Sequence, residues 1–334
     1  MRENLQELIE GRTPSGCLIV AELGVNHDGS ARRAIELLHR ARDAGADAVK
    51  LQLFVPNELC SRLYRAAEIA MLERLRLTDE DHVRICAEAR RIDMPIIATP
   101  FDEPSLELLR RLEIPVVKIG SGEVTHTPLL AKAARTHLPI ILSTGGCEWI
   151  DIERAVAVLR ENGCERLSLL HCVSAYPPPD EQLNLHTIAE LAKRYPECPI
   201  GFSDHTLGLE AAVAAVALGA KIIEKHLTLD CAGDGPDHAA SADPKSFAAM
   251  VRAVRRVEQM LGDGRKRVQP CEGVIGRSAV AARPLVDGDT LIAADIAFKR
   301  PGSGVRPWAA AGLIGRKLRC RIPADEFIHE TDLE

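Results

Sequence analysis

The stretch PIIATPFDEPSLELLRRLEIPVVKIGSGE, residues 95–123, contains the pattern that decides the fold. It begins with a short apolar run, PIIATP at 95–100, and reaches a second run, PVVKIGS, at 115–121. Between them, PSLELLRRLE at 104–113 repeats its apolar residues at spacings of three and four, which is typical of an amphipathic helix. A strand, a helix and a second strand in this order predict two parallel strands joined by a helical crossover.

The same unit recurs along the chain, where eight apolar runs are each followed by an amphipathic segment. Segments such as ARRAIELLHRARDAG (31–45) and DIERAVAVLRENG (151–163) have helical spacing and close with glycine, as helices often do. Eight units over residues 16–261 fit an α/β protein with a (β/α)8 TIM barrel of about 250 residues. A doubly wound open sheet is the structural alternative. The runs are CLIVAEL (17–23), ADAVKLQLF (46–54), PIIATP (95–100), PVVKIGS (115–121), PIILSTG (139–145), LSLLHCV (167–173), PIGFSD (199–204) and KIIEKHL (221–227).

The periodicity ends after Leu261. The following segment, GDGRKRVQPCEG, is charged, contains Gly and Pro and has no apolar period, which is typical of a linker. The rest of the chain contains short β-like pieces between Gly and Pro, and about sixty residues fold alone only marginally. We therefore expect a barrel over residues 1–261, a linker over 262–275 and a small irregular β domain over 276–334.

Composition excludes several functional classes. The 334 residues are 46% hydrophobic and carry a formal net charge of -6, whereas nucleic-acid binding needs a clustered positive excess. The N-terminal segment MRENLQELIEGRTPSG lacks an apolar signal core, and the most apolar helical segment, 211–220, is too short to span a bilayer. The ten cysteines form no CxxC pair, so we expect no disulfide framework. These features predict a cytoplasmic protein that binds neither nucleic acid nor membrane.

Polar side chains follow all eight apolar runs at their carboxyl ends, which is the face where active sites of TIM barrels lie. One polar strand end carries no information, because loops are polar anyway, but eight together indicate an enzyme. The polar residues are Glu22, Asn26, His27, Lys50, Gln52, Thr99, Asp102, Lys118, Ser121, Glu123, Ser143, Thr144, His171, Ser174, Tyr176, Ser203, Asp204, His205, Glu224 and His226.

Two histidines, His205 in GFSDHTLG and His226 in IIEKHLTLD, each end a predicted strand. Imidazoles from adjacent strand ends can converge on one point, which favours a divalent metal site. The alternative is a pair of hydrogen-bonded core histidines. Cys172 follows another strand close to this point, where it either packs or takes part in chemistry.

Two lysines, Lys50 and Lys118, are expected to point into the barrel mouth, together with the hydroxyl groups of Thr99, Ser121, Ser143, Ser174 and Ser203. Fixed cations among hydroxyl donors suit a small phosphorylated carboxylate, although a lysine can also pair with a structural carboxylate. Glu22 and Glu123 come from different strands and could act as a base or orient a sugar hydroxyl. Asp237 in GDGPDHAAS either caps this site or begins a helix.

Ten short motifs, and their order along the chain, resemble the sialic acid synthase family, which includes N-acetylneuraminate synthase and its legionaminic and pseudaminic acid relatives. The resemblance extends from about Val20 to Glu334. It implies a TIM barrel joined to a C-terminal antifreeze-like (SAF) domain, usually assembled as a domain-swapped homodimer. The motifs are AELGVNHDGS, AGADAVKLQ, TPFD, KIGSGE, LSTGG, LLHCVSAYP, GFSDHTLG, EKHLTLD, GPDH and KRPGSG.

The resemblance also implies the reaction, a condensation of phosphoenolpyruvate with an N-acylated mannosamine that releases phosphate by C–O cleavage. A divalent metal, usually manganese with magnesium or cobalt as alternatives, is expected on His205 and His226. Phosphoenolpyruvate is expected on Lys50, Thr99, Lys118, Ser121, Ser143, Ser174 and Ser203. The sugar side corresponds to Glu22, Gln52, Tyr176, Asp237 and Arg300, the last supplied by the partner subunit. The expected catalytic residues are Glu123, which handles protons, Glu22 and Lys118.

Several points stay open at this stage. Ser174 stands where several neuraminate synthases have Asn, which weakens its assignment because a hydroxyl has less reach than an amide. The acceptor is N-acetylmannosamine or 2,4-diacetamido-2,4,6-trideoxymannose. Alternative functions are a 3-deoxy-ulosonate synthase that also uses phosphoenolpyruvate, a Schiff-base aldolase with Lys118 or Lys50 as the nucleophile, and an ice- or carbohydrate-binding module on an inactive barrel.

Overall fold

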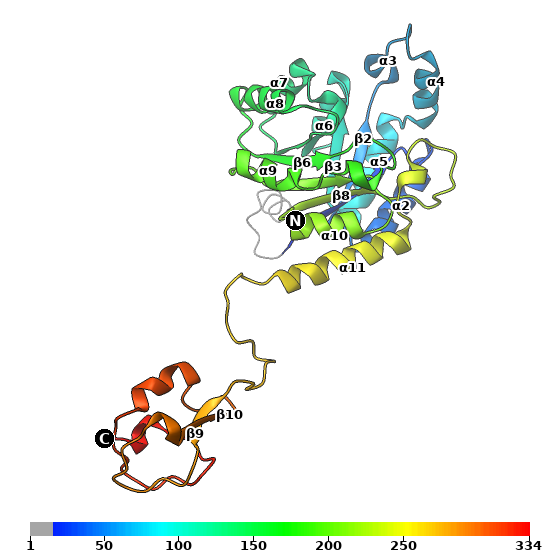
Figure 1. Ribbon diagram of the computed structural model, residues 1–334. Helices are drawn as coiled ribbons and strands as arrows, with labels where there is room; N and C mark the ends of the chain where they lie inside the picture. Colours follow the sequence, from blue (N-terminus) through cyan, green and yellow to red (C-terminus); the bar gives the residue numbers. More distant parts are fainter. Residues whose placement is uncertain (1–15) are drawn as a thin grey trace. The chain divides into compact units, whose positions relative to one another are not determined.

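The computed structural model describes residues 16–334, which form two compact units (Figure 1). The first unit extends to Asp263, and the second comprises Gly264–Glu334. In the first unit eight parallel strands form a closed barrel in which each strand pairs with the next and β8 pairs with β1. The predicted TIM barrel is therefore confirmed, and the open sheet is excluded. The strands are β1 (Leu18–Gly24), β2 (Ala48–Leu53), β3 (Ile96–Pro100), β4 (Val117–Ile119), β5 (Ile140–Ser143), β6 (Leu167–Cys172), β7 (Ile200–Asp204) and β8 (Ile222–His226).

Helices connect successive strands on the outside of the barrel (Figure 1). Several begin with a side-chain cap: the Ser30 hydroxyl accepts from the Arg33 amide, and Thr78 and Asp81 form a capping box. Asp102, one of the polar strand-end residues, is also a cap, because its carboxylate accepts from the amides of Ser105 and Val55. The helices are α2 (Ala31–Asp43), α3 (Pro56–Leu59), α4 (Ala66–Leu75), α5 (Asp79–Arg91), α6 (Glu103–Arg111), α7 (Thr127–Ala134), α8 (Trp149–Glu161), α9 (Thr187–Arg194), α10 (Glu210–Ala217) and α11 (Pro244–Leu261).

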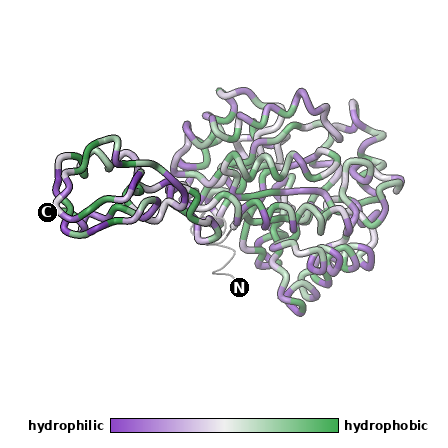
Figure 2. Tube along the Cα trace, turned by 60° about the horizontal axis from the view of Figure 1, so that its bottom comes forward, coloured by the Kyte–Doolittle hydropathy of each residue, from purple (hydrophilic) through white to green (hydrophobic). Residues whose placement is uncertain are grey.

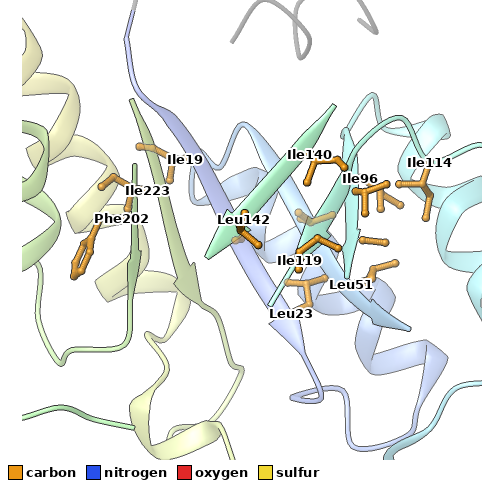
Figure 3. Close-up of a cluster of buried hydrophobic side chains, with 14 of the residues drawn as sticks. Ile19, Leu23, Leu51, Ile96, Ile114, Ile119, Ile140, Leu142, Phe202 and Ile223 are labelled. Atoms are coloured by element: carbon orange, nitrogen blue, oxygen red, sulfur yellow. The ribbon is translucent and has the colours of Figure 1, made fainter. Parts of the chain in front are cut away.

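Alternation along the strands divides the core into two layers. Successive side chains point in turn toward the helices and toward the barrel axis. The outward layer packs against the helices and contains Ile19, Leu51 and Leu142 among many others (Figure 3). A separate cluster fills the lower interior with apolar side chains from every strand except β7, Val116 lying just before β4: Leu18, Val20, Ala48, Ile97, Val116, Ile141, Leu170 and Ile222. Each fully buried Leu or Ile stabilises the fold by about 1.5–3 kcal/mol relative to an exposed one.

The second unit has a small core of its own. Its strands β9 (Ser278–Ala281) and β10 (Ile296–Lys299) pair antiparallel, and the remaining chain forms isolated bridges and 3-10 turns. Apolar segments run along the trace of both units (Figure 2). Residues 262–275, where the linker was expected, contain neither helix nor strand. Among residues 16–334, no helix is long and apolar enough to cross a membrane.

Gly201 of β7 allows the barrel to close, since a Cβ at this position would lie 2.4 Å from the Ile222 carbonyl oxygen and 2.5 Å from Leu170 Cδ2. Gly201→Ala is therefore expected to lower the free energy of unfolding of the barrel by about 1–3 kcal/mol, the usual cost of overpacking. Urea denaturation measures this change. Gly122→Ala is the matched control, because a Cβ there meets no atom within 4 Å. Equal stability of the two variants would contradict the account of barrel closure.

Candidate active site at the carboxyl ends of the strands

A pocket of about 260 Å³ opens above the apolar interior layer of the barrel. It contains both predicted metal ligands, every side chain predicted for phosphoenolpyruvate, and two of those predicted for the sugar. Some lie at inward positions of the strands, and others, such as Ser121, Ser174 and Tyr176, lie in the turns that follow the strands. The lining residues are Lys50, Gln52, Thr99, Phe101, Lys118, Gly120, Ser121, Gly122, Ser143, Cys172, Ser174, Tyr176, Ser203, His205, Glu224 and His226.

The two lysines are buried but have different partners. Lys50 Nζ lies 2.7 Å from Glu224 Oε1 and 3.0 Å from Glu22 Oε2, so it is held between two carboxylates. Lys118 Nζ donates instead to Ser143 Oγ at 2.7 Å and to the Ile119 carbonyl oxygen at 3.0 Å. No carboxylate of residues 16–334 forms an ion pair with Lys118. Its charge is therefore available to an anionic ligand.

For both Lys118 and Glu224, burial and the attraction between opposite charges act on the pKa in opposite directions. Burial disfavours the ammonium and lowers the pKa of Lys118 to about 8. Burial alone would raise the pKa of Glu224, but the charges of Lys118 and Lys50 outweigh it and hold this pKa at about 2. Glu224 is thus ionised at neutral pH while Lys118 is largely protonated.

Hydroxyl groups surround the two lysines, and one of these hydroxyls has no hydrogen-bond partner. Thr99 Oγ1 is buried without a hydrogen-bond partner, which marks a position where a ligand atom could bond. Ser121 Oγ accepts from the Gly145 amide at 2.9 Å. A Cβ at Gly145 would lie 2.4 Å from Ser174 Oγ and 2.9 Å from Ser121 Oγ. Glycine at this position therefore lets the hydroxyls of two strand ends approach each other.

The two histidines lie side by side, with ring centroids 5.4 Å apart. His205 Nδ1 lies 2.9 Å from the Val173 carbonyl oxygen, to which it can donate, and this leaves Nε2 free to act as a ligand. His226 Nδ1 is buried without a hydrogen bond, 3.5 Å from Asp237 Oδ2. Burial holds the pKa of His226 well below its ordinary value, which favours the neutral, ligating form. Within residues 16–334 no group of three or more His, Cys, Asp or Glu residues is arranged so that it could hold a metal ion.

Four of the residues predicted for catalysis or for sugar binding do not line the pocket. Glu22 is fully buried behind Lys50, where Oε1 accepts from Gln52 Nε2 at 2.8 Å. Asp237 lies beside His226. Glu123 belongs to a 3-10 turn after β4, and its Oε2 lies 3.0 Å from His126 Nδ1. Arg300 belongs to the second unit, where it is exposed directly after β10.

Glu224 is the main site residue that the sequence reasoning left without a role. Its carboxylate accepts from Lys50 and from Ser203 Oγ, the latter at 3.0 Å, and it ties two predicted ligand groups together. The strand alternation could have identified it, because Glu224 lies two residues before His226. The same alternation of side chains along a strand places two other polar strand-end residues on the outside of the barrel, away from the site. His171 bonds outward to the Leu183 carbonyl oxygen, and Asp204 pairs outward with Lys225.

Two family models match this chain in succession. The NeuB family model covers residues 37–266, and the SAF domain model covers residues 276–334. The chain belongs to the NeuB family. This result confirms the sialic acid synthase family that the motifs resemble, and it identifies the second unit as a SAF domain.

Relatives within the NeuB family extend over nearly the whole chain. N,N'-diacetyllegionaminic acid synthase of Legionella pneumophila is 36% identical and covers 95% of both chains. Human N-acetylneuraminate-9-phosphate synthase is 34% identical over 97% of this chain and 95% of its own. The crystal structure of the N-acetylneuraminic acid synthetase of Leptospira borgpetersenii, in complex with citrate, is 34% identical. It superimposes with a TM-score of 0.72 over 77% of this chain and 88% of its own.

The lowered pKa of Lys118 predicts how this site binds an anion. Sulfate does not titrate near neutrality, so its affinity should follow the charge of the pocket. As the pH rises through the Lys118 pKa of about 8, the ammonium is lost and the sulfate dissociation constant should increase by up to about tenfold per pH unit. Calorimetric titration from pH 7 to 9 measures this change. Lys118→Met is expected to bind more weakly and to lose the dependence, whereas an unchanged slope in that variant would refute the role of Lys118.

Proposed function

We propose that this NeuB family member condenses phosphoenolpyruvate with an open-chain N-acylated mannosamine to form a nonulosonic (sialic) acid and phosphate. The observation that carries the proposal is one pocket that places the cationic pair Lys50 and Lys118 next to the histidine pair His205 and His226. The first pair suits an anionic phosphate ester, and the second suits a metal-assisted reaction of a carbonyl group. The names of the relatives support the same product class.

In the proposed reaction, carbon 3 of phosphoenolpyruvate attacks the aldehyde carbon, and the aldehyde oxygen takes up a proton. Water then adds to the cationic carbon 2 and loses a proton. The new hydroxyl of the tetrahedral intermediate then gives its proton to the phosphate, which departs together with the bridging oxygen and leaves a 2-keto acid. Lys118, Lys50 and the surrounding hydroxyls hold the phosphate and carboxylate, so that the attacking carbon is fixed in place.

The donor set fits a divalent cation, which we place on His205 and His226, with manganese as the first choice and magnesium or cobalt as alternatives. When bound, such an ion polarises the aldehyde oxygen. The contact of His205 Nδ1 with the Val173 carbonyl and the unpartnered Nδ1 of buried His226 support this assignment. The remaining coordination positions are left to water and substrate.

The acceptor sugar is assigned to the same side of the pocket as the histidines. Tyr176 stacks on His205 at 4.0 Å between ring centroids, and Gln52, Glu22 and Asp237 supply polar groups nearby. Glu123, two residues after Ser121 of the pocket lining, is the proposed proton carrier at the tetrahedral intermediate. Arg300 is proposed to reach this acceptor from the SAF domain of a partner subunit in a swapped homodimer.

A phosphate-release assay tests this function. The protein is incubated with Mn²⁺, with phosphoenolpyruvate carrying oxygen-18 in the bridging position, and with N-acetylmannosamine or 2,4-diacetamido-2,4,6-trideoxymannose. One of the two sugars is expected to release phosphate that contains the label, because the C–O bond is broken. Chelator treatment should abolish this activity and added Mn²⁺ should restore it. Release with neither sugar, or full activity in metal-free protein, would contradict the proposal.

A Schiff-base aldolase is the second candidate, because its nucleophile needs a lysine with a depressed pKa, as Lys118 has. Treating the protein with borohydride in the presence of the substrates, removing the reagent and repeating the assay with fresh substrates separates the two functions. An imine intermediate would be reduced, and the enzyme would be inactivated with substrate attached to lysine. The condensation forms no imine, so activity is expected to continue unchanged.

Mixed dimers test the roles of Glu123 and Arg300 together. Glu123→Gln homodimers should bind phosphoenolpyruvate but lose turnover by about 100-fold, the usual scale for an acid–base group. Arg300→Ala homodimers should also be inactive. When the two chains are refolded together, half of the dimers are mixed and each has one intact site, so activity should return to about one quarter of wild type.

Each negative result has a separate meaning. An active Glu123→Gln homodimer would refute the role of Glu123. Inactive homodimers that form mixed dimers without any gain in activity would refute the contribution of Arg300 from the partner subunit.

A further inference from the structure

A buried ion pair lies next to the two histidines in the sequence and on the outer side of the same two strands. Asp204 and Lys225 are opposite each other in the β7–β8 register, each one residue before a histidine. Because Ser203 and Glu224 point into the pocket, Asp204 and Lys225 point to the outside of the barrel. Lys225 Nζ lies 2.8 Å from Asp204 Oδ2, and the two side chains are 2% and 0% exposed.

The pair also holds the chain on both sides of His205. Lys225 Nζ donates to the Thr206 carbonyl oxygen at 2.7 Å as well as to Asp204. Asp204 Oδ1 accepts from the Thr206 amide at 2.9 Å and from its hydroxyl at 2.7 Å. Both neighbours of His205 are thus connected to one ammonium group.

The two histidines differ in how much the barrel itself restrains them. His226 is the last residue of β8 and pairs with Glu22 of β1, and its carbonyl oxygen accepts from the Ala242 amide at 2.9 Å. His205 lies one residue beyond the end of β7. It therefore depends more on contacts outside the strand, and Lys225 supplies two of them to the adjacent residues.

Stability alone does not account for such a pair. Desolvating two charges costs several kcal/mol per ion, and a neutral replacement of similar volume is often as stable. Outer-sphere groups, by contrast, commonly change metal affinity by about 10- to 100-fold because they orient the ligands.

We infer that Lys225 is a positioning residue that, through Asp204 and Thr206, holds His205 in the orientation for binding a divalent cation together with His226. The inference rests on the proposed metal-assisted function. It assigns Lys225 no contact with substrate or metal.

The test compares Mn²⁺ binding by the free full-length protein, measured from the electron paramagnetic resonance signal of unbound Mn²⁺. Lys225→Met combined with Asp204→Asn removes both charges and leaves no unpaired buried ion. This variant is expected to bind Mn²⁺ about 10-fold or more weakly than wild type, with the folded state verified by circular dichroism. If it does not fold, Thr206→Val, which keeps the ion pair but removes the hydroxyl that donates to Asp204 Oδ1, should still weaken Mn²⁺ binding.

Arg255→Met combined with Asp47→Asn is the matched control. This pair joins α11 to the residue before β2 at the amino end of the barrel, so its loss should change stability without changing Mn²⁺ affinity. Wild-type affinity in a folded Lys225 and Asp204 variant would overturn the positioning role while leaving the metal site intact. A wild-type protein that binds no Mn²⁺ would overturn the metal assignment itself and this inference with it.

Discussion

The structure depends on placing two ammonium groups inside a closed barrel. Lys50 and Lys118 occupy inward strand positions directly above an apolar layer, with side chains almost completely buried. Removing an ion from water costs several kcal/mol, so such groups persist only with counter-charges and hydrogen bonds around them. Glu224 and Glu22 supply the charges around Lys50, and the Ser143 hydroxyl accepts a hydrogen bond from Lys118. The polar residues of the pocket are thus arranged around these two cations.

The charge of one of the two lysines is not balanced by a carboxylate, which suits the binding of an anionic ligand. Lys50 is held between two carboxylates, whereas Lys118 is bonded only to a hydroxyl and a carbonyl oxygen. An anionic ligand can therefore complete the charge balance of a site whose donors are already fixed, and little reorganisation is needed when it binds. The histidine pair adjoins this anion site in the same pocket. In the proposed reaction, one scaffold would present a phosphate ester to a carbonyl group.

Much of this arrangement was predictable because it follows from periodicity. The apolar runs set the eight strands, and the carboxyl-end rule brought Lys50, Lys118 and both histidines to one face. Alternation would also have assigned Glu224 to the pocket and Asp204 to the outside, but the sequence reasoning grouped strand-end residues without it. Other features depend on tertiary contacts that no local pattern encodes. The Glu22 carboxylate meets Lys50 only because β1 pairs with β2, and Asp102 caps a helix instead of facing the site. The proposed role of Arg300 depends on a second chain.

A crystal structure of the full-length protein with phosphoenolpyruvate and Mn²⁺ tests the central claim most directly. The account predicts phosphate and carboxylate oxygens within hydrogen-bond distance of Lys118 Nζ, Lys50 Nζ and the unsatisfied Thr99 hydroxyl, with Mn²⁺ on His205 and His226. Density for phosphoenolpyruvate outside the barrel mouth, with Lys118 still bonded only to Ser143 and Ile119, would contradict it.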